Sequence, residues 1–184
     1  QDLVQIVTRP KLKSVHLLET EVKNDSSKLS EFYNLLVDGT FENDDEAAFH
    51  FYQQEKSHPA YLKLRKTIKD RLVKSLFLID LKKASYDVRQ KAYYESYSEW
   101  AAAKILFGKQ APAAAISLSQ KLLKLAKKFE FTELVVDITH TLRLYYGTIE
   151  GDYKKYQSYN KVFKYYETLW LLENKAEEYY TDLS

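Results

Sequence analysis

The sequence predicts an all-α fold, and two observations carry that prediction. Apolar residues recur at spacings of three and four through most of the chain, which is the period of an amphipathic helix. The 184 residues include only four glycines and three prolines, too few for the frequent turns of a β-sandwich or β-barrel. We therefore expect about seven or eight helices and no strand.

The composition excludes several classes of protein. Cysteine is absent, so disulfides, thiolate metal sites and cysteine nucleophiles are excluded. Hydrophobic residues make up 45% and aromatic residues 15% of the chain, which excludes a disordered protein. No apolar run approaches the roughly 18 residues of a membrane span, and no signal segment is visible. We expect a cytoplasmic protein with no membrane partner.

The N-terminal third predicts short helices. Residues 1–25 are the least readable, although a short helix over 2–7 fits the pattern. Ser26 or Ser27 can cap a helix that ends at Asp38-Gly39, because glycine readily takes the left-handed conformation after a helix. The apolar positions of this helix are Leu29, Phe32, Leu35 and Leu36.

A second short helix follows the acidic residues Glu42, Asp44, Asp45 and Glu46. Asn43 or Asp44 is its predicted N-cap, and carboxylates in the first turn are favoured by the helix dipole. This cap explains the acidic group better than a calcium loop does, because the group lacks alternating ligands and a central glycine. The apolar side comprises Ala47, Ala48, Phe49, Phe51 and Tyr52.

Longer helices are predicted from His58-Pro59 onward. The first runs to about Lys83, and its periodic apolar positions include Leu72 and Leu76. The second opens at Ser85 or Asp87 and ends at Phe107-Gly108. Pro112 begins a third, with proline in the first turn.

Two more helices complete the prediction. Thr132 is the expected cap of a helix that ends at Tyr146-Gly147, and Gly151-Asp152-Tyr153 opens a final helix toward Tyr180. We expect Leu72, Leu76, Leu122, Ala126, Leu142 and Val162 to lie in one continuous core.

Charge and helix length divide the chain. Residues 1–57 hold short helices and a net charge of −5, residues 58–130 carry +10, and residues 131–184 carry −3. We place the domain boundary between an acidic N-terminal segment, 1–57, and a helical-repeat domain, 58–184. Oligomeric state does not follow from these patterns.

Two helix ends suggest an internal repeat. The segments ILFG at 105–108 and LYYG at 144–147 lie 39 residues apart, and a period of about 34–45 residues with two helices is typical of an α-solenoid. Residues 86–180 resemble a tetratricopeptide-repeat (TPR) protein. The segment LLKLAKKF at 122–129 is similar to the second helix and exit of such a unit, and Gly151-Asp152-Tyr153 to the turn between its helices.

This resemblance implies antiparallel helix pairs stacked as a short right-handed solenoid. No repeat-ending proline follows Phe129, and small residues are not cleanly placed where paired helices would touch. Residues 28–81 resemble the N-terminal part of helical bacterial proteins to which no function is attached. The resemblance implies a scaffold or adaptor that binds a protein partner, and it implies no chemistry.

Aromatic residues supply a candidate peptide site. More of them lie on the helices 87–107 and 151–180 than one helix face can bury, so most are core and the surplus would line a groove. The candidates are Tyr93, Tyr97, Trp100, Tyr156 and Tyr159.

A basic band supplies the alternative, which is salt-dependent nucleic-acid binding. Lysines follow the helix that starts at Pro59, and basic residues continue to position 91. A solvated, lysine-rich helix face is the simpler explanation of the same pattern. The candidate residues are Lys63, Lys66, Lys69 and Lys74.

No motif points to an enzyme. The four histidines, His16, His50, His58 and His140, form no pair with metal-ligand spacing. Walker, GxGxxG and GxSxG motifs are absent, and four scattered glycines cannot build a phosphate-binding loop. We expect a non-enzymatic protein without metal or cofactor.

Overall fold

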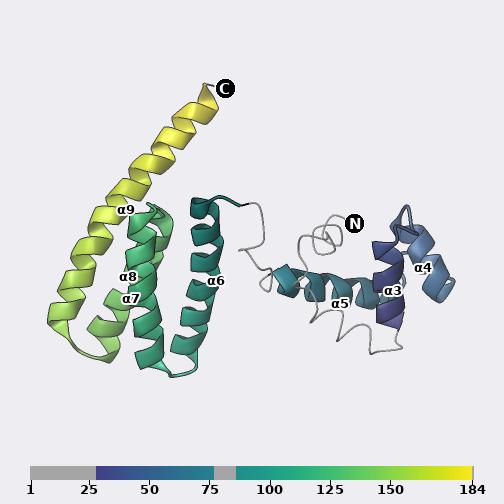
Figure 1. Cartoon of the computed structure of the whole chain (residues 1–184), viewed down its shortest axis with the longest axis horizontal. Coiled ribbons are helices and arrows are strands. Elements are labelled where there is room, and N and C mark those ends of the chain that lie inside the picture. The colour runs from purple at the N-terminus through teal and green to yellow at the C-terminus, as the bar shows by residue number, and fades with distance from the viewer. Residues whose placement is uncertain (1–27, 77–85, 184) are drawn as a thin grey trace. The chain divides into compact units, whose positions relative to one another are not determined.

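The computed structural model describes residues 28–76 and 86–183, and every regular element in these ranges is helical (Figure 1). This confirms the predicted all-α class. The chain divides into two compact units, Gln1–Tyr86 and Asp87–Ser184. The possible helix over 2–7, the caps at Ser26 and Ser27, and the end of the helix toward Lys83 lie outside the described residues.

The first unit contains α3 (Lys28–Val37), α4 (Asp44–Tyr52) and α5 (Pro59–Leu76). Gly39 follows α3 with φ +68°, as predicted for a glycine that ends a helix. The rings of Phe32, Phe51 and Tyr61 meet edge to face at the centre of the core. Phe49, predicted on the apolar side of α4, is instead 61% exposed.

The division between the units differs from the expected boundary at 57/58. Leu64, Ile68 and Leu72 of α5 lie in the same core as Phe32 of α3 and Ala48 of α4. Helix α5 therefore packs with α3 and α4, and the boundary between the units falls between residues 86 and 87 of the sequence. The change in net charge near residue 58 comes from residues on the exposed face of α5. Those residues do not determine which helices pack on its buried face.

The second unit contains α6 (Val88–Gly108), α7 (Pro112–Lys128), α8 (Thr132–Leu144) and α9 (Tyr153–Asp182). Consecutive helices run antiparallel, as predicted, and each packs on the next (Figure 1). Asp87 and Gln90 form a capping box at the start of α6. Asp152 caps α9 after Gly151, which has φ +71°.

Two predicted boundaries in this unit are wrong. Phe131 occupies the N-cap position of α8 without a side-chain hydrogen bond, whereas the Thr132 hydroxyl donates to Glu173 of α9 at 2.8 Å. Gly147 does not end α8, because Tyr145–Ile149 continues as a π-helical turn, η2. In both places a residue of α9 contacts the one that the sequence assigned to the helix end: Glu173 contacts Thr132, and the Tyr156 ring lies against Gly147.

The predicted single core is also wrong. Leu72, with Leu76 packed against it, belongs to the core of the first unit. Leu122, Ala126 and Leu142 belong to a separate core in the second unit, against which Val162 packs. Among the described residues, no helix is long and apolar enough to cross a membrane.

Candidate functional site

The second unit has a hollow on the side where α8 lies between α6 and α9. Its volume is about 370 Å³. We call it the α8 groove, and its lining comprises Tyr97 of α6, Glu133, Leu134, Val136, Asp137 and His140 of α8, and Phe163 and Trp170 of α9.

Helix α8 forms the floor of the groove. Glu133, Asp137 and His140 are four and three residues apart, so their side chains share one side of the helix. Ile138 and Leu142 on the opposite side are fully buried, and Leu134, between the two sides, is buried and also lines the groove. The 3.6-residue period thus turns these three polar side chains toward the groove and most of the apolar side chains of α8 toward the core.

Aromatic rings from the two flanking helices form the walls. Tyr97 is half-buried and lies 4.6 Å from the ring of Tyr93. Phe163 is 7% exposed and anchors α9 on α8, whereas Trp170 is 37% exposed. The hydrogen bond from Thr132 to Glu173 holds the Trp170 turn of α9 beside the first turn of α8.

One end of the groove is acidic. The Tyr97 hydroxyl donates to Glu133 Oε2 at 3.4 Å, and Asp137 accepts from the indole N–H of Trp100 at 2.8 Å and from Lys104. Burial raises the pKa of Tyr97 well above its usual value, and contacts with Tyr93 and Glu133 raise it further. Asp137 is thus neutralised by Lys104, whereas Glu133 has no cationic partner among the described residues.

Arg143 does not line the α8 groove but contacts two residues that do, His140 and Phe163. Its guanidinium lies 3.6 Å from the centroid of the Phe163 ring. One terminal nitrogen donates to Asn160 Oδ1 at 2.8 Å, and the other contacts His140 Nδ1 at 3.1 Å. Because arginine has no acceptor, His140 Nδ1 must be the acceptor in this contact. Arg143 also borders a second hollow of about 360 Å³, whose lining includes Gly147 and Tyr156.

The five predicted aromatic candidates do not share one groove. Tyr97 lines the α8 groove, and Tyr93, 42% exposed, lies behind it. Trp100 is 3% exposed and belongs to the core. Tyr156 lines the second hollow, and Tyr159 stacks on Tyr146 with centroids 5.6 Å apart.

Tyr159 points to a different face from Tyr97. Its hydroxyl accepts a hydrogen bond from Gln120 of α7 at 3.1 Å, so it bridges α7 and α9. The prediction therefore identified one wall of the groove and missed its floor. The four- and three-residue spacing of Glu133, Asp137 and His140, on a helix whose apolar residues fall on another side, is the signal in the sequence that marks the floor.

The four lysines of the alternative site all lie exposed on α5. Lys63, Lys66, Lys69 and Lys74 form no ion pair with any carboxylate in the described ranges. Asp70 and the exposed Leu62 and Val73 lie among them. The rest of the predicted band is divided, because residues 82 and 83 are outside the described ranges and residues 89 and 91 belong to the second unit.

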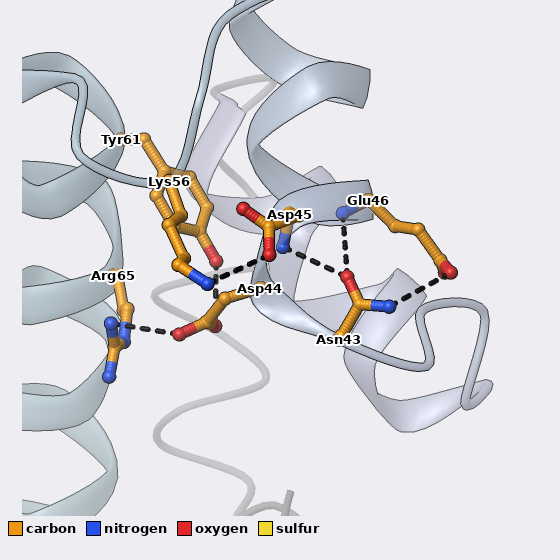
Figure 2. A network of polar contacts seen from close by, with 7 residues as sticks. All are labelled: Asn43, Asp44, Asp45, Glu46, Lys56, Tyr61 and Arg65. Atoms are coloured by element: carbon orange, nitrogen blue, oxygen red, sulfur yellow. Dashed lines mark hydrogen bonds and ion pairs between the residues drawn. The ribbon is translucent and has the colours of Figure 1, made fainter.

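The acidic group near residue 44 is a helix start, as predicted. Asn43 Oδ1 accepts from the backbone N–H groups of Asp45 and Glu46, both at 3.0 Å (Figure 2). The Tyr61 hydroxyl of α5 donates to Asp44 Oδ1 at 2.9 Å, and Arg65 pairs with Asp44 at 2.8 Å (Figure 2). Asp44 thus ties α4 to α5.

Lys56 pairs with Asp45 at 2.9 Å (Figure 2). These carboxylates are occupied by capping contacts and ion pairs within the first unit. In the part of the chain that the structure describes, no group of three histidine or carboxylate side chains is placed to hold a metal ion.

Comparisons of the chain with models of protein families, with curated proteins and with solved structures find no match in any of the three.

Proposed function

We propose that the second unit is a non-enzymatic interaction domain of TPR-like helical-repeat type that binds an extended peptide segment of a partner protein in the α8 groove. The observation that carries the proposal is the convergence of aromatic rings from two helices, Tyr97 of α6 and Phe163 and Trp170 of α9, on one hollow. Aromatic side chains of this kind are common anchors in protein interfaces.

The dimensions of the groove support a peptide rather than a large cofactor. Its volume of about 370 Å³ lies at the low end of the range for small-molecule pockets. An extended peptide needs room for only one or two side chains at a time. The two antiparallel helix pairs, α6 with α7 and α8 with α9, support the repeat-type assignment, because stacked pairs leave one side of each unit open for a ligand.

Selection from a random peptide library tests this function. Peptides selected on the intact protein should lose affinity for Trp170→Ala by about 30-fold, the scale of an interface hot spot of 2 kcal/mol. Tyr179→Ala is the matched control, because Tyr179 lies on the same helix and is 68% exposed but does not line the groove. Failure to enrich any peptide, or equal affinity for wild type and Trp170→Ala, would contradict the proposal.

A second candidate function is salt-dependent nucleic-acid binding by α5. The observation in its favour is that Lys63, Lys66, Lys69 and Lys74 are exposed and unpaired within the described ranges. Four phosphate contacts predict an affinity that falls on the order of 10²-fold between about 50 and 200 mM salt. The aspartate and apolar residues among the lysines favour the peptide function over this one.

Fluorescence anisotropy with labelled single-stranded and double-stranded oligonucleotides separates the two functions. The double substitution Lys63→Glu with Lys66→Glu should remove low-salt binding. Lys161→Glu with Lys164→Glu makes the same change of charge on α9 and should keep most of it. A wild-type protein without low-salt affinity for any oligonucleotide rules out this second function.

A further inference from the structure

The two ends of helix α8 carry opposite charges that are not neutralised by neighbours in the described ranges. The acidic end lies in the α8 groove, and the basic end lies next to the groove, where Arg143 borders the second hollow and contacts His140 and Phe163 of the groove lining. Glu133 lies in the first turn of α8, and Arg143 lies in its last turn. Lys104 pairs with Asp137 and leaves Glu133 as the free carboxylate of the acidic end. The described partners of Arg143 are the Asn160 amide, the His140 imidazole and the Phe163 ring, and none of them is an anion.

The acidic end is suited to a cationic side chain. Glu133 is exposed, and Tyr97 and Trp170 line the same hollow. An ammonium or guanidinium group there would pair with the carboxylate and contact the faces of the aromatic rings, which attract cations. The negative charge of Glu133 also interacts favourably with the helix dipole at the start of α8, and this role requires no ligand.

The basic end is suited to a carboxylate. Arg143 is half-buried, and a partly desolvated charge is normally paired. Phe163 and Asn160 hold the guanidinium plane in place without neutralising it. A guanidinium held in place can bind a carboxylate with little loss of side-chain entropy.

We propose that the ligand of the groove is a peptide segment that carries a lysine or arginine and, about four or five residues away, an aspartate or glutamate. Ten residues separate Glu133 from Arg143, so the two ends are about 15 Å apart along α8. An extended peptide spans that distance in about four or five residues at 3.3–3.6 Å each. The basic side chain lies against Glu133 and Trp170, and the acidic one against Arg143. This inference rests on the proposed function.

A double-mutant cycle on a selected peptide tests the acidic end. Replacing the basic residue of the peptide by methionine should weaken binding to wild type about tenfold, and should change binding to Glu133→Gln less than twofold. Glu95→Gln is the matched control, because Glu95 is exposed on α6 outside the groove lining, and it should behave as wild type.

The basic end is tested first from the peptide side, which leaves the protein unchanged. Replacing the acidic peptide residue by its amide should weaken binding to wild type about tenfold. Arg143→Met, which keeps the apolar stem over Phe163, should remove that difference. If Arg143→Met fails to fold, Arg143→Lys, which keeps the charge and loses the planar fork, should retain part of it.

The outcomes separate this inference from the proposed function. Selected peptides without paired basic and acidic residues, or cycles without coupling, overturn the inference while dependence on Trp170 preserves the peptide function. Loss of Trp170 dependence overturns both.

Discussion

At the scale of single residues, the second unit is shaped where contacts from α9 override local signals. Thr132 has the side chain of an N-cap, yet its hydroxyl donates to Glu173 across the helix pair. Gly147 has the identity of a helix terminator, yet it lies inside a π-helical turn. Tyr156 explains the glycine, because a Cβ atom at position 147 would lie 2.9 Å from Cδ2 of that ring.

Gly147 therefore provides a sharp test of this packing. Gly147→Ala should destabilise the second unit by about 1–3 kcal/mol, because the added methyl group overpacks the contact with Tyr156. The measurement is urea unfolding followed by tryptophan fluorescence. Gly108→Ala is the control, since a Cβ atom there meets nothing within 4 Å, and it should be neutral or stabilising by up to about 1 kcal/mol. Equal effects of the two substitutions would contradict this account of Gly147.

Tyr97 predicts a dependence of stability on alkaline pH. Burial raises the pKa of its phenol in the folded state above the unfolded value of about 10. The folded state then holds the proton more tightly, so this stabilisation is complete below pH 10 and is lost as the pH rises above it. Between about pH 9 and 11, wild type should lose more unfolding free energy than Tyr97→Phe, measured by urea unfolding. Equal losses would mean that Tyr97 ionises as easily when folded.

At the scale of helices, capping signals predicted several starts well. Asn43, Asp87 and Asp152 each accept backbone hydrogen bonds at the start of a helix, where the sequence placed them. These signals are local, because the cap and the first turn lie within four residues of each other. The start of α8 was misjudged because the partner of Thr132 lies 41 residues away.

The capping box of α6 has a measurable contribution. Asp87→Ala should lower the stability of the second unit by about 0.5–2 kcal/mol, because the N–H of Gln90 loses its acceptor. Glu95→Ala, an exposed position inside the same helix, should change stability by less than about 0.5 kcal/mol. Thermal or urea unfolding of the two variants side by side would detect the difference. A loss for Asp87→Ala no larger than that of Glu95→Ala would show that this cap is dispensable.

The sequence revealed only part of the α8 groove. Helical periodicity identifies which side of a helix is apolar, so Tyr97 and the polar side of α8 are accessible to sequence analysis. The meeting of Tyr97 with Phe163 and Trp170 depends on how α6, α8 and α9 pack, and periodicity carries no information on that. Tyr159 was assigned to the groove for this reason, although it faces α7.

At the scale of the whole chain, the residues that the structure describes form two hydrophobic cores in place of the single expected one. Apolar spacing looks the same in α5 and α7, but Leu72 and Leu122 lie in different clusters. Periodicity shows that a helix buries one side and leaves open which helices cover it. The boundary at 86/87 was missed for that reason, and because charge divides the chain elsewhere.

The two cores predict that damage to one leaves the other intact. Both tryptophans of the chain, Trp100 and Trp170, lie in the second unit, so their fluorescence reports that unit alone. Leu122→Ala should lower the unfolding free energy of the second unit, followed by fluorescence, by about 2–5 kcal/mol. Leu72→Ala should leave that fluorescence transition unchanged and shift only the part of the circular dichroism transition that comes from the first unit. A Leu72→Ala variant with an equally shifted fluorescence transition would contradict the division.

The central claim is that a peptide binds in the α8 groove, and the two tryptophans make it directly measurable. In a ¹⁵N-labelled protein, titration with a selected peptide can be followed at the two indole N–H signals, assigned with Trp170→Phe. We predict a large shift for Trp170, which lines the groove, and a smaller one for Trp100, which is buried behind Asp137. Saturating peptide that leaves the Trp170 signal in place would contradict the claim.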